Sequence, residues 1–245
     1  MPTPNLDQKS PKPLLTVIVP VFNEESTISF ILQRVLNLDI ELDVIVINDG
    51  STDRTTTEME QFRDLNHVLI LEHSSNQGKG ASIRTGLHHA KGIYTVIQDG
   101  DLEYNPGDYI KMIQCLVSNQ ADVVFGSRYL AKRKLFNRNR VLFRFGVSTL
   151  NVATRFLYGY HLTDEATCYK LFKTKDLRKM NLQCKRFDFC PEVVAKSAHL
   201  GLKIHEVEID YESRSVQSGK KIRWYDGIEA LYCLWKWRKW KPEAK

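Results

Sequence analysis

Short apolar runs alternate along the chain with longer segments in which apolar residues recur every three or four positions. The runs at 14–20, 42–48, 68–71 and 93–97 have the length of buried strands, and polar residues follow each of them. Helical spacing is found in a segment that ends at Leu36 and in the segments 76–90 and 106–118. This alternation predicts an α/β fold with a doubly wound, mostly parallel sheet, in which a ligand binds at the carboxyl ends of the strands.

The second half of the chain continues this pattern less regularly. Residues 121–125 and 203–210 are typical of strands, and residues 191–199 are typical of a helix. Asp164 stands just before a strand-like run that ends at Phe172. Residues 211–221 form a polar loop that is long enough to close over a charged ligand. His199 and His205 have no partner at ligand spacing, so we assign structural roles to both.

Carboxylates cluster directly after the run at 93–97. Asp99 and Asp101 follow the expected strand, and Gly100 between them permits a sharp turn. Glu103 lies two residues further on and supplies a third oxygen ligand. Mg²⁺ and Mn²⁺ take such ligands together with substrate phosphates. From the spacing alone, a solvated Asp-Gly-Asp turn is an equally good interpretation.

Two other segments carry candidate ligand-binding residues. Asp49 follows the run at 42–48 and is placed to accept hydrogen bonds from a nucleobase or ribose. A helix N-cap is the alternative role, which we assign to Ser51 or Asp53. Gly78 and Gly80 flank Lys79 at the start of a helix, where backbone amides can approach a phosphate or a sugar. The spacing of a Walker loop is missing.

The composition adds an anionic partner to this picture. The 245 residues carry a net charge of +6, which favours nucleic acid, a phosphorylated small molecule or an acidic membrane surface. The five cysteines include no C-x-x-C pair, so they indicate neither a disulfide framework nor a zinc site. A reducing, cytosolic setting is expected. No apolar run reaches the roughly 18 residues that a membrane span needs.

The chain divides into a disordered leader over 1–13, one catalytic domain over 14–221 and an aromatic and basic segment over 222–245. The domain itself contains a strongly basic stretch. From Val123 to Thr163 there is no acidic residue, and a segment rich in Phe and Leu lies within it. A basic helix of this kind predicts contact with a membrane surface or an anionic lipid head group. An ordinary core helix with solvated arginines is the other interpretation.

The last segment interleaves tryptophans with cations. Because indole prefers the head-group zone and lysine prefers anionic lipid, it is typical of an interfacial anchor. We favour membrane contact there over an RNA-stacking surface, since the Trp-Lys-Trp-Arg-Lys-Trp end has no obvious core role. The residues concerned are Trp224, Trp235, Trp237 and Trp240, with Arg223, Lys236, Arg238, Lys239 and Lys241.

Six motifs in order resemble family 2 glycosyltransferases, and most of all the polyprenyl-phosphate branch that contains dolichol-phosphate mannose synthase. They lie at 19–24, 48–53, 76–80, 98–103, 126–128 and 163–170. The resemblance implies the Rossmann-like nucleotide-diphospho-sugar transferase fold of GT-A type. It also implies transfer of a sugar from a UDP- or GDP-linked donor to a polyprenyl phosphate, with inversion at the anomeric carbon. Mg²⁺ or Mn²⁺ is the implied cofactor.

The resemblance also implies a role for each site residue. The nucleotide-sugar would contact Pro20, Asn23, Glu24 and Asp49, with Lys79 and Gly80 nearby. Asp99, Asp101 and Glu103 would hold the metal ion on the diphosphate. Arg128, Arg144 and Ser148 would grip the acceptor phosphate, and Arg214 and Lys221 would neutralise the departing nucleotide. Asp164 would act as a base or would position the acceptor or sugar.

Many members of this branch carry transmembrane helices after the catalytic domain, whereas this chain ends in its Trp/Lys segment. We therefore expect a cytoplasmic enzyme attached peripherally to the cytoplasmic face of a membrane. A lipid-linked or cell-surface glycan is the alternative acceptor. A basic nucleic-acid-binding module is a third possibility, but carboxylates in the central crevice would repel phosphates, and we expect no nucleic acid partner. The nucleobase and the sugar stay open.

Overall fold

Seven strands form one sheet in the order β3-β2-β1-β4-β6-β5-β7 in the computed structural model, which describes residues 12–130, 138–214 and 224–242. Only β6 runs antiparallel to its neighbours, so the expectation of a mostly parallel sheet is confirmed. The strands are β1 (Leu15–Val21), β2 (Leu42–Asn48), β3 (Val68–Glu72), β4 (Tyr94–Ile97), β5 (Val123–Ser127), β6 (Lys170–Lys173) and β7 (Ile204–Glu208).

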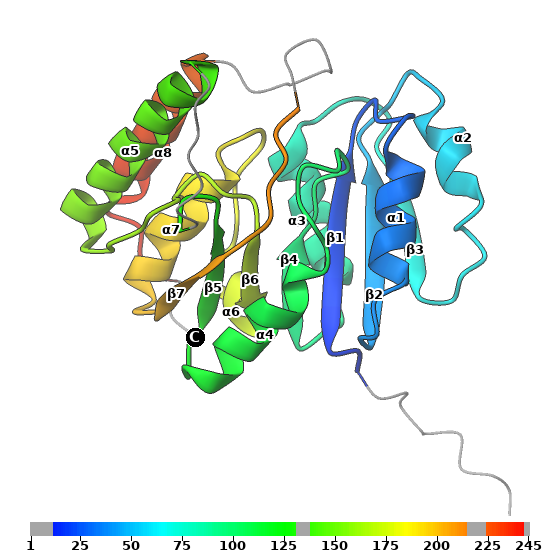
Figure 1. Ribbon diagram of the computed structural model, residues 1–245, viewed down its shortest axis with the longest axis horizontal. Coiled ribbons are helices and arrows are strands. Elements are labelled where there is room, and N and C mark those ends of the chain that lie inside the picture. The colour runs from blue at the N-terminus through cyan, green and yellow to red at the C-terminus, as the bar shows by residue number, and fades with distance from the viewer. Residues whose placement is uncertain (1–11, 131–137, 215–223, 243–245) are drawn as a thin grey trace, which may run out of the picture.

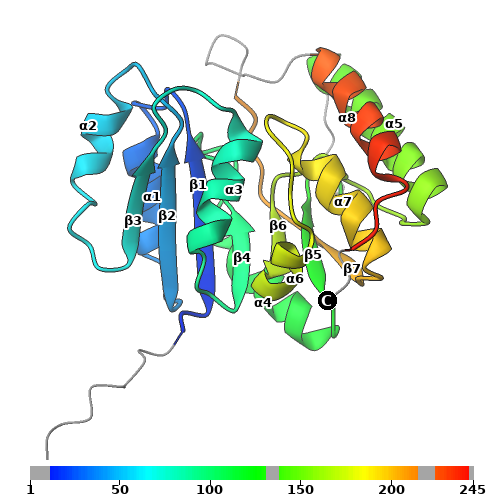
Figure 2. The same cartoon turned by 180° about the vertical axis from the view of Figure 1, so that it is seen from behind.

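Helices cover both faces of this sheet. α1 (Ile28–Leu36) and α4 (Asp108–Ser118) lie on one face (Figure 1), whereas α3 (Lys79–His89), α6 (Thr174–Lys179) and α7 (Phe189–His199) lie on the other (Figure 2). The short α2 (Thr55–Glu60) contacts α1. α5 (Arg138–Tyr158) and α8 (Trp224–Trp237) pack against each other and against α7, outside the β5–β7 end of the sheet.

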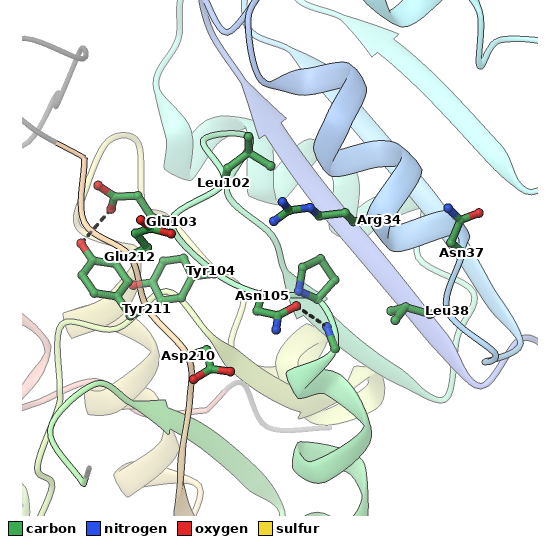
Figure 3. A pocket seen from close by; sticks show the side chains of 12 residues that line it. Arg34, Asn37, Leu38, Leu102, Glu103, Tyr104, Asn105, Asp210, Tyr211 and Glu212 are labelled. Atoms are coloured by element: carbon green, nitrogen blue, oxygen red, sulfur yellow. Dashed lines mark hydrogen bonds between the residues drawn. The ribbon is translucent and has the colours of Figure 1, made fainter. Parts of the chain in front are cut away.

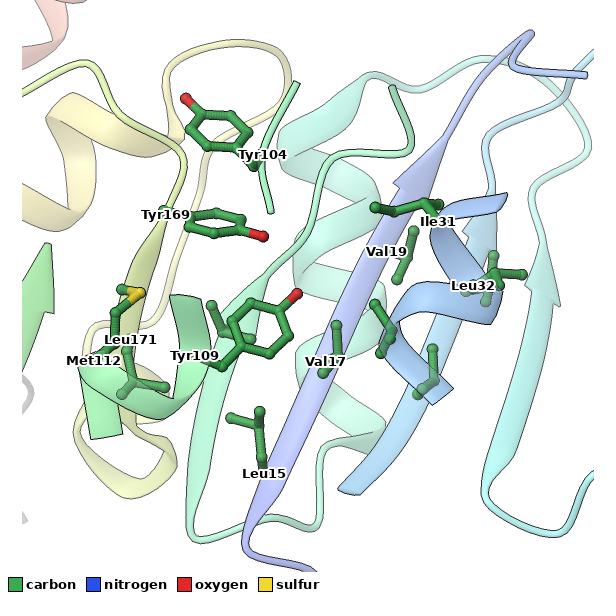
Figure 4. Close-up of a cluster of buried hydrophobic side chains, with 14 of the residues drawn as sticks. Leu15, Val17, Val19, Ile31, Leu32, Tyr104, Tyr109, Met112, Tyr169 and Leu171 are labelled. Carbon is green, nitrogen blue, oxygen red and sulfur yellow. The ribbon is translucent and has the colours of Figure 1, made fainter. Parts of the chain in front are cut away.

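The alternation of side chains along β1 separates two hydrophobic cores. Leu15, Val17 and Val19 point toward α1 and α4, and Ile18 points toward α3. Three tyrosine rings extend the first core toward the carboxyl ends of the strands (Figure 4). They are Tyr109, Tyr169 and Tyr104, and the last two stack with ring centroids 4.5 Å apart. Both β1 and β4 are therefore held rigidly just below the loops that follow them.

Two expectations for the second half need correction. The strand-like run expected directly after Asp164 becomes a strand only at Lys170, and Glu165, instead of pairing in the sheet, donates its amide to Asn151 of α5. The Trp-rich end does have a core role. Trp237 is buried beneath the Lys196 ammonium, 4.0 Å from its ring centroid, and Trp240 packs on His199. The ring of His199 also contacts the carbonyl of Trp237, as a structural residue does.

The outer faces of α5 and α8 expose apolar side chains. Phe145 and Phe156 on α5 are 72% and 88% exposed, and Val152 lies between them in sequence. Ile228, Tyr232 and Trp235 are exposed on α8. None of the helices in the described ranges has the length and apolar content to cross a bilayer. The two helices nevertheless present apolar side chains to solvent, which is how surface-binding helices are built.

Candidate functional site

The acidic turn after β4 lies at the carboxyl end of the sheet, beside the end of β1. Asp99 and Asp101 both retain some exposure, 16% and 20% of their side chains. The backbone amide of Glu103 donates to Oδ1 of Asp101 over 3.1 Å and closes the turn. Leu102 adopts a φ of +62°, a conformation that is strained for a bulky residue. The turn thus holds its carboxylates in place at a local cost in backbone energy.

The guanidinium of Arg214 lies among these acids. Its two terminal nitrogens donate to the two oxygens of Glu24, each over 2.9 Å, and one of them lies 3.3 Å from Oδ2 of Asp101. The backbone amide of Arg214 donates to Oε1 of Glu103 over 2.7 Å. Burial, together with the charges of Asp99 and Glu103, raises the pKa of Asp101 to about 7 despite the opposing charge of Arg214. Asp101 is therefore ionised at neutral pH only with the help of a nearby positive charge.

Lys79, at the start of α3, forms an ion pair with Asp99. Its ammonium also donates to Sγ of Cys168 over 2.7 Å. Although burial opposes the charge of Lys79, the Asp99 carboxylate raises its pKa well above the usual value. The backbone amide that follows Lys79 already has a hydrogen-bond partner within the protein, since the amide of Gly80 donates to the carbonyl of Arg186 over 2.9 Å. Our expectation that this amide approaches a phosphate is thus not met in the described conformation.

Asp49 is buried and holds the loop that leads into α3. Its oxygens accept from the amides of Gln77 and Gly78, over 2.9 and 2.8 Å, and contact Nδ1 of His73 at 2.7 Å. Gly78 has a φ of +97°, and a Cβ there would come within 2.4 Å of the Lys185 carbonyl. The sequence analysis missed His73, since a lone histidine after a strand carries no distinctive spacing. The N-cap of α2 is Arg54 and not Ser51 or Asp53, and Oδ1 of Asp53 accepts from the amide of Thr55 over 2.9 Å just before that helix.

The loops after β1 and β2 are tied together beside the acids. Asn23 has a φ of +51°, and its side-chain oxygen accepts from the amide of Thr52 over 2.8 Å. The amide of Asn23 donates to Oγ of Ser51 over 3.0 Å. Pro20 lies in β1 in register with Ile47. The structure therefore gathers Pro20 and Asn23 at one edge of the crevice, as expected from strands that end together.

Arg128 and Asp164 form a buried, two-pronged ion pair. Nε and one terminal nitrogen of Arg128 donate to the two carboxylate oxygens, each over 2.7 Å, and the amide of Arg128 donates to Oδ2 over 3.0 Å. Although burial works against the charge, Asp164 raises the pKa of Arg128 well above its usual value. With both oxygens accepting hydrogen bonds, Asp164 fixes the position of Arg128.

Tyr129 brings Arg128 close to α5. The guanidinium carbons of Arg128 and Arg144 lie 5.8 and 5.5 Å from its ring centroid, which are cation–π distances. Ser148 is exposed on α5 one turn beyond Arg144. The structure thus brings Arg128 and Arg144 to one tyrosine ring, with Ser148 on the next turn of the helix that carries Arg144. Tyr129 was missed because one tyrosine after a Gly-Ser-Arg motif gives no signal of such a contact.

A groove of about 740 Å³ adjoins the acids on the face that carries α1 and α4 (Figure 3). Arg34 extends from α1 toward the segment 102–107, and Tyr211 and Glu103 form the opposite wall. The hydroxyl of Tyr211 donates to Oε2 of Glu103 over 2.8 Å. Glu103 therefore belongs to both the groove and the acidic site.

The three candidate metal ligands fit a hard divalent cation only in part. Asp99 and Asp101 offer oxygen ligands at the carboxyl end of β4, as Mg²⁺ and Mn²⁺ require. The three acids do not converge as we expected. Glu103 faces Tyr211 and Arg214, and the described ranges contain no group of three or more His, Cys, Asp or Glu side chains arranged around one point. Lys221 lies outside the described residues.

This fold and this site define a GT-A type glycosyltransferase, with an acidic turn and basic partners at the carboxyl ends of the strands. The sequence profile of Glycosyl transferase family 2 matches residues 16–180. The chain therefore belongs to glycosyltransferase family 2, and the resemblance inferred from the six motifs is confirmed.

Two curated relatives act on a dolichyl phosphate by name. The UDP-N-acetylglucosamine–dolichyl-phosphate N-acetylglucosaminyltransferase of Methanococcus voltae is 26% identical over 229 residues, which cover 85% of this chain and 90% of that protein. A dolichyl-phosphate beta-glucosyltransferase of Trichomonas vaginalis is 28% identical over 236 residues, which cover 86% and 72%.

Solved structures share the fold at lower identity. The glucosyl-3-phosphoglycerate synthase of Mycobacterium tuberculosis, in complex with Mn²⁺, UDP and glucosyl-3-phosphoglycerate, superposes with a TM-score of 0.69 at 17% identity, covering 95% of this chain and 82% of that one. S. aureus TarS in complex with UDP-GlcNAc gives a TM-score of 0.61 at 17% identity, covering 91% and 66%. The GT-A fold expected from the resemblance is thereby confirmed.

Proposed function

We propose that this protein transfers a sugar, with inversion, from a nucleotide-diphospho-sugar to a polyprenyl phosphate. The observation that carries this proposal is that Arg128 and Arg144 both lie over the Tyr129 ring, with Ser148 exposed one helical turn beyond Arg144. Two guanidinium groups near an exposed hydroxyl match the charge and hydrogen-bonding capacity of a phosphate monoester. The printed names of the two curated relatives support an acceptor of this kind.

The donor would lie across the acidic turn. Asp99 and Asp101 would hold Mg²⁺ or Mn²⁺ against the diphosphate, and Glu103 would become a third ligand after rearrangement. Asn23, Glu24, Asp49 and Pro20 would border the nucleoside. The cation would offset the negative charge that the leaving nucleotide acquires. Lys79, Arg214 and Lys221 would add positive charge on the same side. The solved neighbour that binds Mn²⁺ and UDP supports this arrangement.

The acceptor needs little activation. A phosphate monoester carries nucleophilic oxygens at neutral pH, so no strong general base is required. Arg128 would orient the phosphate for attack on the face of the sugar opposite the nucleotide. Asp164, whose oxygens both accept from Arg128, would act by positioning that guanidinium instead of removing a proton.

The membrane would supply the acceptor. α5, which carries Arg144 and Ser148, packs against α8 on one flank of the molecule, and both helices expose apolar side chains. If this flank rests on the cytoplasmic face of a membrane, a polyprenyl phosphate would reach the arginines with its chain still in lipid. Phe145 and Phe156 would enter the interface, and Trp235 would add an interfacial indole.

A lipid-extraction assay tests the proposal. Full-length protein receives radiolabelled UDP- or GDP-sugars, polyprenyl phosphate and Mg²⁺ or Mn²⁺, and the expected product partitions into organic solvent. Asp101→Asn should abolish the product, whereas Asp39→Asn, which changes an exposed loop acid, should retain it. If the label stays entirely in water-soluble products with every donor tested, the proposal of a lipid acceptor is contradicted. Label that appears on a glycan primer would favour the alternative acceptor.

A further inference from the structure

The segment 211–214 lies across the acidic turn. Tyr211 forms an antiparallel bridge with Tyr104, and the amide of Glu212 donates to the carbonyl of Glu103 over 2.9 Å. Two more hydrogen bonds, from the Tyr211 hydroxyl and the Arg214 amide, go to the Glu103 carboxylate. The bridge and these hydrogen bonds thus join the segment to residues 103 and 104. As a result, the Arg214 side chain lies next to the acids that follow β1 and β4.

Each metal-binding aspartate is already neutralised by a basic side chain of the protein. Lys79 pairs with Asp99, and Arg214 pairs with Asp101. An isolated carboxylate in a partly buried site is unfavourable, so an internal cation stabilises these acids. A divalent ion that binds the same oxygens must compete with that cation.

The contacts of Arg214 suit a cation that can be displaced. Its side chain is 19% exposed, and it lies 3.3 Å from Asp101, which is longer than a close charge-assisted hydrogen bond. Its Nε is buried and has no hydrogen-bond partner. A buried donor without a partner costs free energy in this position, and leaving the site would remove that cost. By contrast, Lys79 is fixed at the start of α3, where the loop around it is held by Asp49 and by Arg186.

We propose that Arg214 is an internal competitor of the divalent cation and occupies the Asp101 side of the site until the cation displaces it. This inference rests on the proposed metal-dependent use of a nucleotide-sugar. Once displaced, the guanidinium remains within the reach of its segment and can pair with the diphosphate that the metal brings. A single arginine then weakens metal binding without donor and assists the leaving group when the donor is present.

Metal binding measured without donor tests the competition. Mn²⁺ alone is titrated into the full-length protein, and free Mn²⁺ is followed by electron paramagnetic resonance. Arg214→Gln should bind Mn²⁺ at least about fivefold more tightly than the wild type, the lower limit of common coupling between ligands. Arg214→Lys keeps the charge but loses the two-pronged contact with Glu24, so its affinity should lie between the two. Arg54→Gln, which removes an exposed arginine of the neighbouring loop, should match the wild type.

The variant Asp101→Asn distinguishes a failure of this inference from a failure of the proposed metal-dependent function. Wild-type binding that depends on Asp101, with no tighter binding in Arg214→Gln, would overturn the inference and leave the proposed function intact. An absence of Asp101-dependent Mn²⁺ binding in the wild type and in Arg214→Gln would overturn the metal-dependent function and the inference with it.

A second measurement needs no variant. Trypsin can cleave after Arg214 only when that side chain leaves the acids, so Mn²⁺ should accelerate this cut at least about fivefold. The other tryptic cuts, followed in the same samples by mass spectrometry, serve as the internal reference. A cut after Arg214 that Mn²⁺ does not accelerate relative to the others would contradict the displacement.

Discussion

Tyr211 donates a hydrogen bond of 2.8 Å to Glu103, and its ring centroid lies 5.1 Å from the guanidinium carbon of Arg128. One side chain therefore contacts an acid of the proposed donor side and a cation of the proposed acceptor side. Neither contact could be foreseen from the chain order, because the three residues come from different loops. The arrangement suggests that the hydroxyl and the ring of Tyr211 have separable effects.

Tyr211→Phe removes the hydroxyl and keeps the ring. We expect the KM for the donor to rise about 10-fold or more, since a hydrogen bond to a charged group contributes about 1.5–3 kcal/mol, whereas the KM for the acceptor should change little. Tyr211→Ala should raise both constants. Tyr232→Phe, at an exposed position of α8, is the matched control. Equal changes of both constants in Tyr211→Phe would show that the two effects are not separable.

The pair of Arg128 and Asp164 should matter for stability as well as activity. Asp164→Asn leaves a buried guanidinium without its counter-charge and should lower the free energy of unfolding by about 3–5 kcal/mol. The double variant Asp164→Asn/Arg128→Met should recover much of that stability and remain inactive. Chemical denaturation and the extraction assay measure the two effects. An Asp164→Asn protein with wild-type stability would show that the ion pair is not needed to hold the loop.

Glu165 predicts a pH dependence of stability. Both of its carboxylate oxygens are buried without a hydrogen-bond partner, and burial, opposed by the charge of Lys170, raises its pKa to about 8. Between its unfolded value of 4.5 and about 8, the folded protein holds a proton that the unfolded chain has released. Stability should therefore fall as pH rises through this window, by about 1.4 kcal/mol per pH unit, and level off above it.

Glu165→Gln removes this titration. Its free energy of unfolding should lose that part of the slope between pH 5 and 8 when urea denaturation is repeated at several pH values. Glu208→Gln, at an exposed carboxylate of β7, should follow the wild-type curve. Parallel curves for Glu165→Gln and the wild type would mean that Glu165 is ionised in the folded protein.

The apolar flank of α5 and α8 predicts membrane binding. Phe145→Ser/Phe156→Ser removes two highly exposed rings and should reduce sedimentation with anionic vesicles at least about 10-fold, because each ring buries apolar area in the interface. Phe30→Ser, which removes an exposed ring of α1 on another face, should bind as the wild type does. Equal loss in both variants would indicate a general surface effect.

Much of the fold could be predicted from the sequence alone. The strand 42–48 coincides with β2, and the other strands of the first half lie within one residue of their predicted ends, because short apolar runs in a parallel sheet are buried on both faces. The acidic turn and its place at the end of β4 followed from the same pattern. The later half was less regular. There the strand expected directly after Asp164 begins only at Lys170, and the tertiary contacts of Asp164 and Glu165 leave no periodic signal in the sequence.

By itself, the order of apolar runs and polar ends determined the doubly wound sheet and the edge at which the site lies, since both depend on local periodicity. The partners of the charged residues were decided only by the tertiary structure. Arg214 is 190 positions from Glu24, and Lys79 is 89 positions from Cys168. Contacts over such separations depend on how the loops pack above the sheet, and the energy of a charge depends on its burial and its neighbours, neither of which is written in the local sequence.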